Sequence, residues 1–178
     1  MNKPKPIPTD IGEYLQYDSS TDTLKWIKKT GNRGYVQVGD IAGSTDTSGR
    51  KHVKFKGSTY KAYRVIWFLQ YGVQPPDTID HINGVEQGDT LENLRGATTQ
   101  QQNQNRRKAS NNISGFKGVG YHKASGKFRA RIMVNHTRIE LGCFDTPEEA
   151  HLAYCNAAEK LHGDFANFGN GCVILESV

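Results

Sequence analysis

The chain has 178 residues, a length that suits one domain or two small ones. Its net formal charge is +5, its mean hydropathy is −0.67, and no apolar run approaches the ~20 residues of a membrane span. The first ten residues are rich in Pro and Lys and lack the apolar stretch of a signal peptide. We therefore expect neither a membrane-spanning nor an exported protein.

The cysteine content points to a reducing compartment. The three cysteines are an odd number and include no Cys-x-x-Cys pair; they are Cys143, Cys155 and Cys172. This pattern predicts neither a disulfide framework nor a cysteine-based zinc finger. A location in the cytoplasm fits best.

Basic residues are concentrated in one part of the chain. Residues 1–94 have a net charge of +1, residues 95–139 carry ten basic residues and no acidic one, and residues 140–178 have a net charge of −6. A block of this kind is typical of proteins that bind a polyanion, most simply a nucleic acid. The alternative is an ordinary basic surface exposed to solvent.

The N-terminal part predicts a β-rich region followed by a helix. Residues 11–17 suit a short helix, and residues 23–60 suit short strands broken by turns. Residues 52–56 alternate between polar and apolar side chains, as a half-buried strand does. Residues 63–71 have apolar residues at helical spacing, and Gly72 ends this predicted helix.

The central part combines a hairpin pattern with an Asp-His pair. Residues 79–82 predict a strand, Asn83-Gly84 is typical of a hairpin turn, and Asn93-Leu94-Arg95 completes the pair. Thr98 suits the N-cap of a polar helix that extends to Arg107. A neutral histidine can accept a proton from water near neutral pH. The alternative is a carboxylate that caps a turn beside a surface histidine.

Residues 80–107, DHINGVEQGDTLENLRGATTQQQNQNRR, resemble the HNH nuclease family of phage and intron-encoded homing endonucleases. The resemblance implies two short strands packed on a helix around one divalent metal. It implies that Asp80 ligates this metal, that His81 is the general base, and that Asn93 holds the loop against the base.

The second metal ligand of that family falls on Gln102, where relatives more often carry Asn or His. Asn103 is the nearby alternative. Oxygen ligands suit Mg²⁺ or Mn²⁺ rather than zinc.

The C-terminal part predicts three strands and one helix. The strands are expected at residues 116–121, 127–134 and 137–144, with Ile139, Leu141 and Cys143 facing inward. Thr146-Pro147-Glu148-Glu149 is typical of a helix start, and Gly163 ends the helix. The helix is expected to cover the apolar face of the sheet, which leaves the face with Lys127, Arg129 and Arg131 exposed.

Residues 114–168 resemble the Apetala-two/ERF-type DNA-binding domain through KGV, KFRARI, LGCF, TPEEAHLAY and FANF. The resemblance implies a sheet that reads duplex DNA in the major groove, with Arg129 and Arg131 at strand positions that contact bases and phosphates. Plant members carry Trp where Phe128 stands. The predicted DNA-contacting residues are Arg95, Arg106, Arg107, Lys117, Tyr121, Lys123, Lys127, Arg129, Arg131 and Arg138.

These interpretations predict an α+β chain in five segments. The segments are a β-rich region (1–57), a ββα-metal nuclease domain (58–108), a linker (109–113), the Apetala-type domain (114–168) and a tail (169–178). The predicted function is a metal-dependent endonuclease on double-stranded DNA in the bacterial cytoplasm, with no membrane and no small-molecule substrate. The alternative is a sequence-specific DNA-binding regulator with a decayed nuclease segment.

Overall fold

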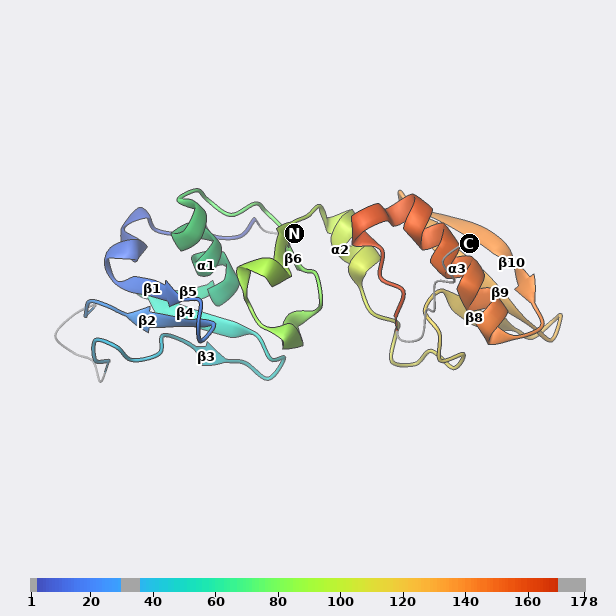
Figure 1. The fold of residues 1–178 in the computed structure, drawn as a ribbon, viewed down its shortest axis with the longest axis horizontal. Helices are drawn as coiled ribbons and strands as arrows, with labels where there is room; N and C mark the ends of the chain where they lie inside the picture. The colour runs from blue at the N-terminus through green and yellow to red at the C-terminus, as the bar shows by residue number, and fades with distance from the viewer. Residues whose placement is uncertain (1–2, 30–35, 170–178) are drawn as a thin grey trace. The chain divides into compact units, whose positions relative to one another are not determined.

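A computed structural model describes residues 3–29 and 36–169 of the chain (Figure 1). The chain forms two compact units, Met1–Thr98 and Thr99–Val178. The predicted nuclease segment 58–108 therefore contributes residues to both units. Of the predicted tail, residues 170–178 lie outside the described part.

Short strands and one α-helix make up the first unit. Strands β1 and β2 form a two-stranded sheet, β3, β4 and β5 form a three-stranded sheet, and β6 and β7 form a hairpin, all antiparallel. The elements are β1 (Leu15–Asp18), β2 (Thr23–Trp26), β3 (Ser44–Thr45), β4 (Lys51–Phe55), β5 (Ser58–Lys61), α1 (Ala62–Tyr71), β6 (Ile79–His81) and β7 (Leu94–Gly96), with short 3-10 turns at Thr9–Glu13, Val85–Gln87 and Leu91–Asn93.

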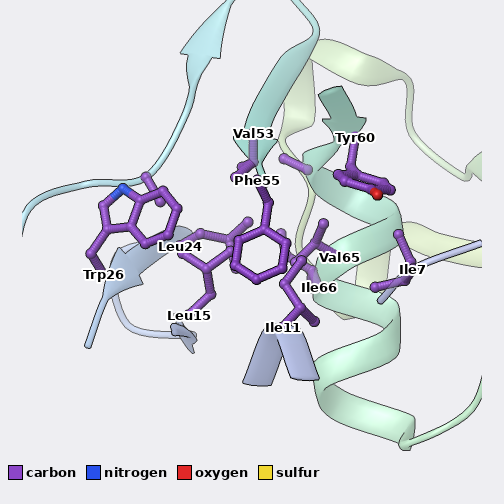
Figure 2. Close-up of a cluster of buried hydrophobic side chains, with 12 residues drawn as sticks. Ile7, Ile11, Leu15, Leu24, Trp26, Val53, Phe55, Tyr60, Val65 and Ile66 are labelled. Atoms are coloured by element: carbon purple, nitrogen blue, oxygen red, sulfur yellow. The ribbon is translucent and has the colours of Figure 1, made fainter. Parts of the chain in front are cut away.

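The core of this unit lies between α1 and the strands. Figure 2 shows Phe55 of β4 among side chains from α1, from β1 and from the N-terminal 3-10 turn. Phe55 is 1% exposed, and the ring of Tyr14 packs edge-on against it at 5.3 Å. The short helix predicted at residues 11–17 is only partly correct: the 3-10 turn at Thr9–Glu13 covers its first residues, but Leu15 begins β1 and pairs with Trp26. That pairing buries Leu15 against Phe55, which local sequence patterns do not reveal.

The second unit is a three-stranded antiparallel sheet packed on a long helix, as predicted (Figure 1). Strand β9 is central and pairs with β8 and β10, and α3 packs on all three strands. The elements are α2 (Thr99–Asn105), β8 (Val119–His122), β9 (Lys127–Val134), β10 (Thr137–Phe144), α3 (Pro147–His162) and a 3-10 turn (Gly163–Phe165). The bounds of β9, β10 and α3 match the prediction.

Helix α2 is shorter than the run that ends at Arg107. Its last carbonyls are occupied by side chains of the same unit: Lys117 Nζ donates to Gln104 O at 2.8 Å, and Asn167 Nδ2 donates to Asn105 O at 2.8 Å. In a longer helix, these two carbonyl groups would instead accept hydrogen bonds from backbone N–H groups of the next turn. The bonds from Lys117 and Asn167 attach α2 to the C-terminal unit.

A β-bulge in β10 corrects one predicted face. The register shifts between Glu140 and Gly142, so that Leu141 is the extra residue of the bulge. Ile139 pairs with Ile132 before the bulge, and Cys143 pairs with Arg129 after it. Cys143 is therefore exposed on the arginine face and does not point inward. Strict alternation cannot continue through an inserted residue.

The structure forms a disulfide that the sequence did not indicate. Cys155 is buried on α3 and is disulfide-bonded. A single disulfide is not a disulfide framework, so the prediction that no such framework exists is not contradicted. In the part of the chain that the structure covers, no helix has the length and apolar character to cross a membrane. The cytoplasmic location stays a prediction.

The first turn of α3 has a capping box. Glu149 N donates to the Thr146 hydroxyl at 3.3 Å, and Thr146 N donates to the Glu149 carboxylate at 3.4 Å. We expect Thr146→Ala to lower the free energy of unfolding by about 1 kcal/mol, because one helix amide loses its acceptor. Urea denaturation of the chain measures this change. Thr146→Ser keeps the hydroxyl and is the control; an equal loss in both variants would contradict the role of the cap.

Candidate functional site

One face of the C-terminal sheet carries a row of cations, which we call the arginine face: Lys127, Arg129 and Arg131 of β9 and Arg138 of β10. The alternate residues of β9, Ala130 and Ile132, are buried against α3. Arg138 pairs with Met133, which follows Arg131 on the same side of β9. The structure therefore brings together four of the ten predicted DNA-contacting residues on one surface.

Two acidic side chains also lie on the arginine face. Glu140 is the cross-strand partner of Arg131, and its carboxylate lies 3.5 Å from Arg129 Nε. Asp145 lies 3.0 Å from Lys127 Nζ. Both acids lie within six residues after residue 139, so the acid-free block of the sequence does not correspond to an acid-free surface. Such solvent-accessible pairs contribute about 0–1 kcal/mol, which a phosphate can outcompete.

Tyr121 lies on the other side of the sheet. It pairs with Phe128, and the two rings meet edge-on at 5.4 Å. Phe128 belongs to the side that packs against α3. Tyr121 is about half exposed but does not extend the arginine face, contrary to the sequence-based interpretation.

The remaining predicted contacts lie elsewhere. Lys123 is in the turn between β8 and β9, and Arg106 and Arg107 are exposed after α2. The Lys117 Nζ donates a hydrogen bond to Gln104 O, and burial lowers the pKa of Lys117 to about 8. Arg95 belongs to the first unit. None of these five is part of the arginine face.

The β6–β7 hairpin holds a second cluster of polar residues. Asp80 pairs across the strands with Arg95, which donates to Asp80 Oδ2 from Nε at 3.0 Å and from Nη2 at 2.8 Å. His81 is the next residue and its ring packs edge-on against Tyr63 of α1 at 5.1 Å. Strand alternation thus places the carboxylate and the imidazole on opposite sides of the hairpin.

His81 has a carboxylate partner that the sequence did not reveal. Its Nε2 lies 2.8 Å from Oδ1 of Asp89, and both side chains are 6% exposed. Asp89 is in the polar loop, and its backbone N–H donates to Asp22 Oδ2 at 3.1 Å. A histidine eight residues before an aspartate has no distinctive spacing, so only the folded loop identifies the pair.

Asn93 ties the loop between the two strands. Its Oδ1 accepts from Asn83 N at 2.8 Å, and its Nδ2 donates to Gly84 O at 3.0 Å and to Gly88 O at 2.8 Å. Asn93 is buried, so these bonds replace the water that its amide would otherwise bind. The side chain holds the loop that carries Asp89.

The hairpin offers oxygen donors for a hard cation. The carboxylate of Asp80 is one, and Asp89 Oδ2 is buried without a hydrogen-bond partner among the described residues. Mg²⁺ commonly takes one or two protein carboxylates and completes its shell with water and substrate phosphates. The described residues contain no cluster of three His, Cys, Asp or Glu side chains that could hold a metal ion. Gln102, the predicted second ligand, is in α2 and belongs to the other unit.

Comparison with known proteins identifies the class of the C-terminal unit first. Residues 114–164 match the AP2 domain family, so this unit contains an AP2 DNA-binding domain. The resemblance to this domain type is thereby confirmed over residues 114–164, and the resemblance of residues 80–107 to HNH nucleases stays a prediction.

The chain also has a phage relative. It is 32% identical over 113 residues to Protein 3.8 of Escherichia phage T7, which covers 61% of this chain and 93% of the relative. The chain belongs to the family of this phage protein. No solved structure matches the chain.

Proposed function

We propose that the protein binds double-stranded DNA in a sequence-specific manner through the arginine face. This proposal rests on how the side chains of the AP2 sheet are divided between its two faces. The apolar side chains pack on α3, and the cations lie on the opposite face. Specific DNA-binding surfaces are strongly basic and combine phosphate contacts with base contacts. The AP2 match at residues 114–164 supports the same conclusion.

The spacing of the arginines fits the DNA helix. Residues i and i+2 of a strand are about 6.6–6.8 Å apart, which is close to two base steps of about 3.4 Å each. With β9 along the major groove, Arg129 and Arg131 therefore reach base pairs two steps apart. A guanidinium can bind guanine O6 and N7 in a bidentate manner. Glu140 accepts hydrogen bonds only, so it suits a cytosine N4 or positions Arg129.

Binding selection tests this proposal. The full chain is incubated with a random pool of DNA duplexes, and the affinity for the selected site is compared with that for an unrelated duplex and for each single strand. We expect the selected duplex to bind at least ~10³-fold more tightly than the unrelated duplex at one fixed salt concentration. Equal affinity for the duplex and its single strands would contradict the proposal.

We infer a second candidate function, phosphodiester hydrolysis, from the pair of His81 and Asp89. A neutral His81 that donates its Nε2 proton to Asp89 keeps Nδ1 as the acceptor for a proton from water. Asp89 then fixes the orientation of the ring and stabilises the imidazolium that forms. The resemblance of residues 80–107 to HNH nucleases supports this assignment.

By the resemblance to HNH nucleases, a divalent cation would be held by the carboxylate of Asp80, together with DNA phosphates. When bound, such a cation neutralises charge on the phosphate and on the leaving oxygen. Within the chain, Arg95 orients the carboxylate of Asp80, and Asn93 holds the loop. Because His81 and Asp89 are almost fully buried, hydrolysis requires this loop to open toward the substrate.

A further inference from the structure

A pocket of about 240 Å³ lies within the C-terminal unit, beside the arginine face. Side chains of α2, β9, the β9–β10 turn and α3 line it. Four of the lining residues have basic side chains, namely Lys117, Arg131, His136 and His162, and none is acidic. We call it the cationic pocket. The DNA-binding proposal does not account for it, because Lys117 and His162 are not on the arginine face.

Lys117 is a partly buried cation without a carboxylate partner among the described residues. Its Nζ donates to the carbonyl of Gln104 at 2.8 Å, and in the described residues no carboxylate lies within ion-pair distance of it. Burial lowers its pKa to about 8, because desolvation disfavours the charged form. A bound anion would offset the solvation that this partly buried charge has lost.

His162 presents an unsatisfied nitrogen in the same pocket. Its Nε2 lies 3.0 Å from the carbonyl of Met133, which accepts a hydrogen bond. Its Nδ1 is buried and has no partner among the residues that the structure describes. Burial and the nearby charge of Lys117 lower the pKa of His162. A buried nitrogen without a partner is uncommon and marks a place where a ligand can bind.

The β9–β10 turn adds donors at the rim. Asn135 and His136 both have left-handed backbone conformations, with φ of 49° and 63°. Glycine is the preferred residue at the second position of such a turn, so His136 places an imidazole there at some conformational cost. The Asn135 Oδ1 accepts from Gln100 Nε2 at 2.6 Å, which leaves the amide nitrogen of Asn135 as a further donor.

We propose that the cationic pocket binds a phosphate group. A phosphate offers several acceptor oxygens and a full negative charge, which matches ammonium, guanidinium and amide donors and the imidazolium form of His162, in which Nδ1 as well as Nε2 carries a proton. The phosphate belongs either to the DNA beside Arg131 or to a free nucleotide. The first source rests on the proposed function, and the second does not.

Titration of the full chain with inorganic phosphate tests the pocket. Binding is measured by calorimetry at constant ionic strength, with chloride as the reference anion. We expect saturable binding in the wild-type chain and at least tenfold weaker binding in Lys117→Met, which keeps the length of the side chain. His162→Gln retains a nitrogen near Nε2 for the carbonyl of Met133 but removes Nδ1, and it should also weaken binding. Lys160→Met, on the exposed side of α3, is the control and should bind as the wild type does.

The same variants identify the source of the phosphate. If Lys117→Met lowers the slope of log K against log salt for duplex DNA by about 0.9, the pocket holds a DNA phosphate. If this variant loses inorganic phosphate but keeps the DNA slope, the pocket serves a free nucleotide. A chain that binds no DNA but still binds phosphate would contradict the proposed function and leave the pocket supported. Absence of saturable phosphate binding, or equal binding in the wild type, Lys117→Met and His162→Gln, would overturn this proposal.

Discussion

Gly118→Ala is expected to lower the free energy of unfolding of the AP2 unit by about 2–5 kcal/mol. Gly118 has φ of +78°, a region that costs a residue with a Cβ about 1–2 kcal/mol. The added Cβ would also overlap the ring of Tyr154, which is buried between α3 and the sheet. Forcing atoms into a packed core costs about 1–3 kcal/mol. Denaturant titration of the chain measures the sum.

Gly126→Ala separates the two causes. Gly126 has φ of +68°, but the nearest atom to its added Cβ is the Tyr121 hydroxyl oxygen at 3.9 Å. This variant should therefore lose only the conformational part, about 1–2 kcal/mol. Equal losses in the two variants would show that Tyr154 does not pack against Gly118 as described.

His81→Ala is expected to lower the rate of metal-dependent DNA nicking by about 10²–10⁴, the usual contribution of a general base. Asp89→Asn should lower the rate as well, because it weakens the ion pair that stabilises the protonated ring. The assay follows supercoiled DNA with Mg²⁺ or Mn²⁺ against EDTA. Neither change touches the arginine face, so the affinity for duplex DNA should stay the same. His52→Ala, outside the hairpin, is the control.

Two results would contradict the assignment of His81 as a general base. If the wild-type chain shows no metal-dependent nicking, the protein acts as a DNA-binding protein and the hairpin is a structural element. If His81→Ala unfolds the first unit at the assay temperature, as circular dichroism would show, the pair of His81 and Asp89 stabilises the fold instead.

The elements predicted most accurately from the sequence are those with strong local signals. Strand β9 alternates along all of its eight residues, and α3 begins with a Thr-Pro-Glu-Glu cap and ends before a glycine. Both patterns depend only on neighbouring residues, and the bounds that they predict agree with the structure. The AP2 domain could be predicted for the same reason.

The features that sequence reasoning missed depend on register and on distant contacts. The bulge at Leu141 reverses the face of Cys143, and the pairing of β9 with β10 brings Glu140 beside Arg129. The partner of His81 is Asp89, a loop residue with no distinctive spacing. These relations are set by tertiary structure, so no local pattern contains them.

The salt dependence of DNA binding tests the central proposal most directly. The full chain is titrated with its selected duplex over a range of salt concentrations, beside Arg129→Gln/Arg131→Gln. The matched control is Lys54→Gln/Lys160→Gln, which removes the same charge from exposed positions outside the arginine face. The proposal predicts that the arginine variant loses about 1–3 kcal/mol of binding for each base contact and about 0.9 in slope for each phosphate contact. The control should keep both the affinity and the slope of the wild type. Equal affinities and slopes in the two double variants would contradict the assignment of the arginine face as the DNA-binding surface.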